Sequence, residues 1–381
     1  MIRVTLLQGE KLLQGDQSLI DRWSKEKGER LWVDIESTDR SFIEPLLEER
    51  FGFHELAAED CLSAATLPKY DAFPDYDFFI FRSINMNVIG HKVDTIKMAS
   101  FLSSDFLFTI HPQRLISVNV VYDRLPQDAR LISSGTDFLL HAILDAQVDL
   151  YFPLMEEIEE MVDEIQHLIF TCPTQSLLDQ LLTLKRDLNL LRRNSLPQRE
   201  LFNQISRGSS KFIQQDHLIY FRDLYDHMFR ITESIDVERD LASGTMEAYL
   251  SVVANRTNEI MKVLTIFSAV LLPINTVAAI YGMNFLHMPE LRWHYGYLWA
   301  FLLMLIVSLT PLLFFKRRGW LRTGDGQERT AGYEQIAWPK RFQAELTGSP
   351  NSSVVIPSES QGSQSGGAAG NPDAITPSTQ N

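Results

Sequence analysis

Two long runs without charged residues stand towards the C-terminal end of the sequence, at 263–280 and 297–315. Each is close to the ~20 apolar residues that a helix needs to cross the ~30 Å hydrocarbon core of a bilayer. The pattern therefore predicts two membrane-spanning helices, at about 262–281 and at 297–316. A short polar loop, 282–296, joins them.

The N-terminal part, 1–133, alternates strand-like with helix-like segments. Runs rich in β-branched and aromatic residues predict strands at 3–7, 31–35, 77–84, 96–102 and 106–110. Helix-like segments at 42–51 and 54–62 lie between them. This mixture predicts an α/β domain.

Helical spacing takes over at 134–210, where we predict antiparallel acidic helices. One covers 138–169, with Pro153 as a kink, and a second resumes after Pro173. The simplest interpretation of their acidic residues is a solvated helix face. The alternative is that this face concentrates cations near the entrance of a pore.

One very long helix is predicted over 211–281, because no proline occurs before Pro273 and Gly244 is the only glycine. It begins as a soluble stalk and continues as the first membrane helix. At 1.5 Å per residue, ~70 residues make roughly 100 Å, so this helix needs neighbours along its length.

Steps of three and four residues trace a stripe along this helix that is small or polar where a packed seam is usually Leu or Ile. With its bulky neighbour Leu264, the stripe in and near the membrane is Asn258, Met261, Leu264, Thr265, Ser268, Leu272, Asn275 and Ala279. Polar groups in lipid face partner helices or a water-filled path.

Both interpretations stand for Thr265 and Ser268, whose hydroxyls also serve as contacts between helices. For Asn258 and Asn275 we favour a pore. The large apolar members of the stripe would form a narrow, dry constriction. On the cytoplasmic stretch of the same stripe, Glu247 would form an acidic ring at the inner mouth.

The bend Gly282-Met283-Asn284 follows the first run directly. Gly and Asn are ordinary helix terminators, so a simple helix stop is one interpretation. Between two membrane runs, we interpret the bend as the outer mouth of a pore. A ring of Asn284 amide oxygens would accept hydrogen bonds from hydrated Mg²⁺, which gives up its water reluctantly. Glu290 would raise the local cation concentration.

Composition narrows the function classes. The net charge of −14 argues against nucleic acid as a partner and permits a cation. The two cysteines, Cys61 and Cys172, cannot build a thiol metal site. The sequence contains no GxxxxGK[ST] loop and no evident nucleophile–base pair. We therefore expect no nucleotide, no organic cofactor and no enzyme activity.

The orientation follows from charge. The N-terminus lacks a signal-peptide pattern, and only Arg292 is a permanent positive charge between the two runs. Basic residues flank the runs on their other sides: Arg256, Lys262, Lys316, Arg317, Arg318 and Arg322. The positive-inside rule then predicts that both termini are cytoplasmic and that membrane lipid surrounds the helices. The basic cluster occupies 317–323, and 324–381 is expected to be a disordered tail.

The segment Tyr281-Gly282-Met283-Asn284-Phe285, followed by Met288-Pro289-Glu290-Leu291, resembles the signature loop of the CorA family of divalent-cation channels. Thr257-Asn258-Glu259 resembles that family's entry to the first membrane helix, and Glu247 its acidic mouth. Asn275 stands where the family often has threonine. The resemblance covers about 30–322. It implies a cytoplasmic α/β domain with long helices, two membrane helices per chain, and a funnel-shaped homopentamer in the plasma (inner) membrane.

Two soluble stretches resemble the segments of this family that hold a regulatory metal ion. They are Phe51-Gly52-Phe53-His54 with the following Glu59-Asp60, and the sequence FRDLYDH at 221–227. The resemblance implies that Asp60 and Asp223 share Mg²⁺ between subunits, with Glu59 and Asp145 nearby. Facing carboxylates repel one another unless Mg²⁺ bridges them, so high internal Mg²⁺ would hold the ring closed. Without the resemblance, these residues are ordinary solvated acids.

The expected function is thus inward Mg²⁺ movement through a homo-oligomeric channel. The first alternative is transport of Zn²⁺, Co²⁺ or Ni²⁺, for which His287 and His294 near the loop are relevant because zinc prefers such ligands. The second alternative is a membrane-anchored sensor or scaffold that transports nothing.

Overall fold

The computed structural model describes residues 1–63, 66–85, 93–284, 289 and 293–320. The predictions for Glu290, for His287 and for the tail after residue 320 fall outside these residues.

In the described part of the chain, seven strands form one mixed sheet with the order β2-β1-β3-β7-β6-β5-β4. The strands are β1 (Ile2–Gln8), β2 (Lys11–Gly15), β3 (Arg30–Glu36), β4 (Lys69–Ala72), β5 (Asp77–Asn85), β6 (Asp94–Leu102) and β7 (Phe106–His111). Strands β3 and β7 pair in parallel, with Val33 opposite Phe108, and the other described pairs are antiparallel.

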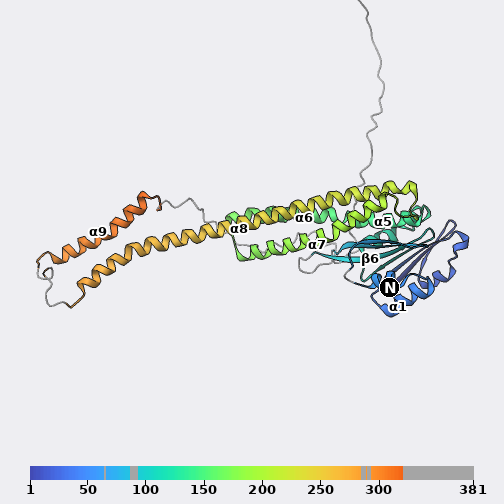
Figure 1. Ribbon diagram of the computed structural model, residues 1–381, viewed down its shortest axis with the longest axis horizontal. Coiled ribbons are helices and arrows are strands. Elements are labelled where there is room, and N and C mark those ends of the chain that lie inside the picture. Colours follow the sequence, from blue (N-terminus) through green and yellow to red (C-terminus); the bar gives the residue numbers. More distant parts are fainter. Residues whose placement is uncertain (64–65, 86–92, 285–288, 290–292, 321–381) are drawn as a thin grey trace, which may run out of the picture. The chain divides into compact units, whose positions relative to one another are not determined.

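Helices cover both faces of this sheet (Figure 1). One face packs against α1 (Arg40–Pro45), the π-helical turn Leu46–Arg50 and α2 (Glu55–Leu62). The other packs against α3 (Ile116–Arg124), α4 (Arg130–Ser133), α5 (Thr136–Asp149), α6 (Tyr151–Thr171), α7 (Gln175–Ser206) and α8 (Leu218–Tyr281). Short 3-10 turns lie at Gln17–Arg22, Lys25–Lys27 and Gln215–His217.

Strand β5 shows why the sheet needs cover on both sides. Phe78 and Ile80 point into the core beneath α1 and α2, whereas Phe79 and Phe81 point into the core beneath the long helices. All four side chains are fully buried. Alternate residues of a strand face opposite sides, so a strand buried on both faces is a nearly continuous apolar run.

The five predicted strands are confirmed with shifts of one or two residues at their ends. The helical segment expected over 138–169 is present, but its interruption lies at Leu150, between α5 and α6, three residues before the kink expected at Pro153. Pro153 follows directly, in the first turn of α6, and proline lacks the N–H that would bond to the carbonyl of Asp149. The helix expected over 42–51 is also divided, at Pro45.

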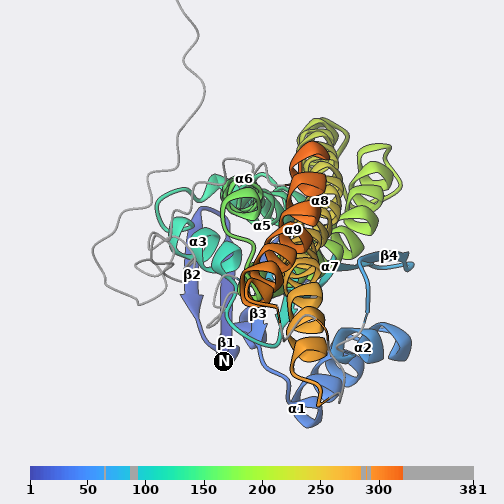
Figure 2. The ribbon, with the colours of Figure 1, turned by 90° about the vertical axis from the view of Figure 1, so that its left-hand side faces the viewer.

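The long helix α8 begins at Leu218, several residues later than predicted, and continues unbroken past Pro273 to Tyr281. Helix α9 (Gly296–Arg317) runs back beside the last third of α8, as both views show (Figures 1 and 2). The expected class, an α/β domain followed by long helices with apolar helices near the C-terminus, is confirmed.

Candidate functional site

Three described helical segments are long and apolar enough to cross a membrane: Thr136–Thr171, Gln215–Tyr281 and Gly296–Arg317. Burial separates them. Half of the most apolar window in the first segment is buried, against 0% in the second and 6% in the third. The apolar side chains of the first segment pack into the core of the soluble part. Those of the C-terminal part of α8 and of α9 are left uncovered. Of the three segments, the two predicted membrane runs are therefore the ones suited to cross a membrane.

The predicted stripe on α8 is exposed throughout in the single chain. Met261 is 55% exposed, Leu264 is 56% exposed and Leu272 is 71% exposed. The remaining members share this exposure: Glu247, Asn258, Thr265, Ser268, Asn275 and Ala279. Large apolar side chains left this bare on a helix require partners that the single chain does not supply.

The stripe also lies on the opposite side of α8 from α9. The residues of α8 that α9 partly covers include Ile266, Val270, Pro273 and Val277. Because a helix turns through about 100° per residue, Met261, Ser268 and Ala279 lie roughly half a turn away from that covered side. Helix α9 thus covers part of α8 and leaves the predicted stripe exposed, together with large apolar residues such as Val263 and Phe267.

The polar members of the stripe differ in how their groups are used. The hydroxyl of Thr265 donates to the carbonyl of Met261 at 2.7 Å, within its own helix. That bond satisfies the hydroxyl without any partner helix. The amides of Asn258 and Asn275 lie on the exposed face and are free to contact another chain or water.

Helix α8 ends at the predicted bend. Gly282 has a right-handed backbone (φ −84°), and its N–H donates to the carbonyl of Ala278 at 3.0 Å. A Cβ at this position would lie 3.3 Å from that same oxygen, so close approach favours glycine here. Met283 and Asn284 follow as exposed residues beyond the helix end. The bend is therefore a helix stop, and the pore-mouth interpretation stays a prediction.

The proposed regulatory residues Glu59 and Asp60 lie in the last turn of α2. This helix begins with a cap, in which His54 Nδ1 accepts from the N–H of Leu56 at 3.1 Å. The Asp60 carboxylate is held by Lys69 of β4, with 2.6 Å between Nζ and Oδ2. Burial opposes the charge of Lys69, but the hydrogen bonds that its ammonium group donates to Asp60 and Asp71 outweigh burial and raise the pKa of Lys69.

The backbone at the end of α2 is held by a second lysine. Lys97 of β6 is almost fully buried, and its Nζ donates to the carbonyls of Asp60 at 2.7 Å and of Cys61 at 2.5 Å, and to that of Ser63. Burial lowers the pKa of Lys97 to about 8. The last carbonyls of a helix lack partners within the helix and attract a cation, so Lys97 both caps α2 and fixes the position of Asp60.

Asp223 and Asp145 come together in one chain. Asp223 lies on the exposed side of α8, 3.7 Å from Nε2 of His227. Asp145 is half-buried on α5, where burial and the charge of Asp223 raise its pKa and His227 opposes the rise. A cation near Asp145 would be stabilised by the negative charge of Asp223.

Asp60 and Asp223 are not joined within one chain, because α2 and α8 pack on opposite faces of the sheet. Among the described residues, no group of three or more His, Cys, Asp or Glu side chains could hold a metal ion. Oxygen donors of the Asp type do fit Mg²⁺, which binds through one or two carboxylates and keeps several of its waters.

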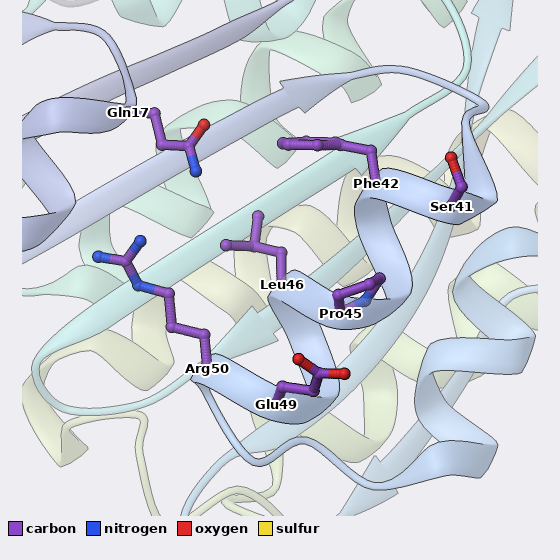
Figure 3. A pocket seen from close by; sticks show the side chains of 7 residues that line it. All are labelled: Gln17, Ser41, Phe42, Pro45, Leu46, Glu49 and Arg50. Atoms are coloured by element: carbon purple, nitrogen blue, oxygen red, sulfur yellow. The ribbon is translucent and has the colours of Figure 1, made fainter.

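A shallow surface depression lies elsewhere, between the turn at Gln17–Arg22 and α1. It is lined by Gln17, Ser41, Phe42, Pro45, Leu46, Glu49 and Arg50 (Figure 3). Its cation, Arg50, is paired with Asp21. Within this lining, Glu49 is the one carboxylate, so the depression has little to offer a divalent ion.

Sequence reasoning missed Lys69, Lys97 and His227. His227 stood in a stretch that the analysis already selected, four residues after Asp223, and this spacing places both on one face of a helix. The two lysines carry no comparable signal, because each meets α2 only through the pairing of distant strands.

Comparison with known proteins gives concordant matches. The model of the family described as "CorA-like Mg2+ transporter protein" matches residues 27–317. The cobalt/magnesium transport protein CorA of Thermotoga maritima is 32% identical over 291 residues, covering 76% of this chain and 83% of that protein. The magnesium transport protein CorA of Haemophilus ducreyi is 26% identical, covering 84% of this chain and 100% of that protein.

The solved structure of the CorA magnesium transporter from Methanocaldococcus jannaschii superposes with a TM-score of 0.73 at 17% identity. The superposition covers 84% of this chain and 99% of the other. At this identity, the likeness is informative about the fold alone.

Proposed function

Because this chain belongs to the family of CorA-like Mg²⁺ transporter proteins, we propose that it forms a homo-oligomeric channel for Mg²⁺ entry. Mg²⁺ is the transported ion of the family, and membrane location is consistent with it. The proposal adds the route of the ion, the assembly and the control by internal Mg²⁺.

The observation that carries the proposal is the bare stripe of α8 on the side away from α9. Two membrane helices cannot enclose a conduit, so several copies must meet around an axis. Head-to-tail contacts in a closed ring are the usual solution. With α8 innermost, α9 lies outside against lipid, and the stripe lines the path. The family resemblance implies five subunits.

Along that path, each part of the stripe has its own role. Asn284 and the preceding bend form the filter, where neutral amides contact the water shell of Mg²⁺ and hold the ion weakly enough to release it. Met261, Leu264 and Leu272 form a dry constriction, which closes the path when the ring is tight. Glu247 attracts cations to the inner mouth.

The direction of transport follows from the membrane potential. With both termini in the cytoplasm of the plasma (inner) membrane, ions enter from the side of Asn284. At 100 mV, a divalent ion gains about 4.6 kcal/mol on entry, twice the value for a single charge. No nucleotide is needed for transport in this direction.

We propose that Mg²⁺ closes the channel by joining Asp60 of one subunit to Asp223 of the next. The opposite placement of α2 and α8 supports a site between subunits, because one chain does not bring these two carboxylates together. Glu59 and Asp145 add negative charge nearby. Loss of the ion leaves these acids to repel one another and frees the subunits to shift.

Co²⁺ is the second candidate ion, because the relative from Thermotoga maritima is named for cobalt as well as magnesium. Hydrated Co²⁺ has the same charge as hydrated Mg²⁺, and a filter that contacts ions through their water shells distinguishes such ions poorly. Competition between the two ions in the flux experiment below separates the possibilities.

The test is Mg²⁺ entry into liposomes that contain the purified protein, a Mg²⁺-sensitive dye and an inside-negative potential. We expect entry with the wild type and none with Asn284→Ala, which assembles normally by size-exclusion chromatography. Ser209→Ala, an exposed position between α7 and α8, is the matched control and is expected to transport.

Equal entry with wild type and Asn284→Ala would remove the filter assignment. Zn²⁺ entry under a proton gradient, without Mg²⁺ entry, would instead identify a zinc transporter. An absence of flux for any ion would indicate an anchored sensor.

A further inference from the structure

The carboxylate of Asp60 is already occupied by a cation that belongs to the chain. Lys69 Nζ lies 2.6 Å from Oδ2 of Asp60 and 2.6 Å from Oδ2 of Asp71. The side chains of Lys69 and Asp60 are 32% and 34% exposed, so an ion arriving from solvent reaches this pair. Any metal ion that binds the Asp60 carboxylate must compete with the ammonium group of Lys69.

The second partner of Lys69 is fixed beside the first. Lys69 and Asp71 are alternate residues of β4, a strand at the edge of the sheet, and therefore point to the same side. They pair with Ile80 and Phe78 of β5, and the ammonium group of Lys69 lies 5.6 Å from the centre of the Phe78 ring. If Lys69 loses Asp60, it retains Asp71 without leaving its strand.

The main chain of Asp60 is held in place when the side chain of Lys69 moves. Lys97 holds the backbone carbonyls at the end of α2, so the Asp60 side chain changes partner around a fixed main chain. A fixed carboxylate thus faces an ammonium group that can move between two acids. This geometry allows the ammonium group on Asp60 to be exchanged for another cation.

We propose that Lys69 is a built-in competitor of the regulatory cation at Asp60. When Mg²⁺ is scarce, its ammonium neutralises Asp60. When Mg²⁺ is abundant, the divalent ion takes Asp60 and Lys69 withdraws to Asp71. Lys69 thereby sets the Mg²⁺ concentration at which the chain responds. The inference rests on the regulatory role proposed above for Asp60.

The competitor also favours divalent over monovalent ions. K⁺ and Na⁺ carry the same charge as the lysine ammonium, and neither gains by replacing a tethered group of equal charge. Mg²⁺ brings twice the charge and is attracted by Asp223 of the neighbouring subunit as well. A tethered single charge thus screens the site from the abundant monovalent ions of a cell.

Substitutions at Lys69 and at its second partner, Asp71, are expected to shift the Mg²⁺ response in opposite directions. Lys69→Met removes the competitor and lowers the Mg²⁺ concentration needed for half of the effect. Asp71→Asn removes the alternative partner, leaves Lys69 on Asp60 and raises that concentration. Each shift is expected to be about two- to fivefold, the range that exposed ion pairs are worth. Lys69→Arg keeps the charge and is expected to stay within about twofold of wild type.

The experiment uses the full-length protein in lipid nanodiscs and follows its thermal unfolding over a series of MgCl₂ concentrations. The half-effect concentration for the rise in Tm is compared among wild type, Lys69→Met, Lys69→Arg and Asp71→Asn. Inhibition of liposome flux by internal Mg²⁺ is a second readout and is expected to shift in the same direction.

Asp223→Ala separates the two proposals. If this variant loses the Mg²⁺ effect while Lys69→Met and Asp71→Asn keep the wild-type half-effect concentration, the regulatory site stands and the competitor is overturned. If both Asp60→Ala and Asp223→Ala keep the full Mg²⁺ effect, the regulatory site itself fails. If Lys69→Met does not fold, Asp71→Asn decides alone, because it retains the lysine and predicts the opposite shift.

Discussion

The Nζ atom of Lys97 donates a 2.7 Å hydrogen bond to the backbone carbonyl of Asp60. A buried cation thus fixes the main chain of a residue whose side chain is bound at the surface by a different lysine. The division matters for the proposed regulatory site, because a carboxylate that exchanges one cation for another must keep its place. Substitution of Lys97 therefore tests whether this lysine fixes the main chain of Asp60.

Lys97→Met is expected to lower the stability of the cytoplasmic domain by about 1–3 kcal/mol, because it leaves buried carbonyls of α2 without a donor. It should also weaken the Mg²⁺-dependent rise in Tm, since Asp60 loses its fixed position. Thermal unfolding with and without MgCl₂ measures both effects. Lys11→Met, at an exposed lysine of β2, is the control. Equal results for the two variants would contradict a capping role for Lys97.

A buried charge network supports the sheet itself. Asp34 accepts from Arg3 at 2.6 Å and from Thr109 at 2.7 Å, and it lies 2.9 Å from Nε2 of His111. The other ring nitrogen of His111 faces the carbonyl of Gln113 at 2.7 Å. Both ring nitrogens of His111 therefore face oxygen atoms. Burial works to raise the pKa of Asp34, but His111, Thr109 and Arg3 outweigh it and the pKa is lowered.

Asp34→Asn is accordingly expected to lower the free energy of unfolding by about 3–5 kcal/mol, because the partly buried Arg3 loses its counter-charge and the buried His111 and Thr109 lose a charged hydrogen-bond partner. In wild type, the same stabilisation is present above the ordinary pKa of Asp, ~4, and is lost as the pH falls through the lowered pKa of the folded state. Denaturant unfolding at several pH values measures this. Asp75→Asn, at an exposed site, should change little.

Glu157 predicts a pH dependence of the opposite sign. Burial and the neighbouring Glu160 raise the pKa of Glu157 to about 7. The folded chain therefore holds a proton that the unfolded chain releases, and stability falls as the pH rises from the unfolded pKa towards 7. Glu157→Gln should match wild type in Tm at pH 5 and exceed it at pH 8. The exposed Glu156→Gln is the control, and a constant difference at both pH values would refute the assignment.

Gly244 within α8 and Gly282 directly after it should respond differently to substitution by alanine. A Cβ at Gly244 meets nothing within 4 Å, so Gly244→Ala should stabilise the helix by about 0.5–1 kcal/mol. At Gly282, the Cβ would press on the carbonyl of Ala278. Gly282→Ala is expected to displace the Met283-Asn284 bend and reduce Mg²⁺ entry. Circular-dichroism melting and liposome flux distinguish the two, and full transport by Gly282→Ala would count against the filter.

Strong periodic signals made much of this fold predictable. The apolar runs of α8 and α9 and the strands around Phe79 and Phe108 are visible because each buries or exposes a continuous set of apolar residues. Strands β2 and β4 were missed because they are short and lie at the edges of the sheet, where little apolar surface is needed. The break at Leu150 was also missed, although Pro153 marked its neighbourhood.

The candidate site was predictable in part, and for a similar reason. The stripe on α8 follows from helical spacing alone, and the carboxylates came from the family resemblance. The partners of those carboxylates could not be predicted from the sequence, because Lys69 and Lys97 meet α2 only after β4, β5 and β6 have paired in register. Such contacts depend on tertiary structure and leave no local pattern in the chain.

The continuity of α8 has a mechanical consequence. Asp223 lies near its first turn, and Asn284 stands three residues beyond its last, so one rod joins the acid proposed to bind the regulatory ion to the amide proposed to select the transported one. Over the ~90 Å that separate them at 1.5 Å per residue, each degree of tilt at the sensing end displaces the far end by about 1.6 Å. The continuous helix therefore works as a lever, in which a tilt of a few degrees at Asp223 becomes a displacement of several ångströms at Asn284.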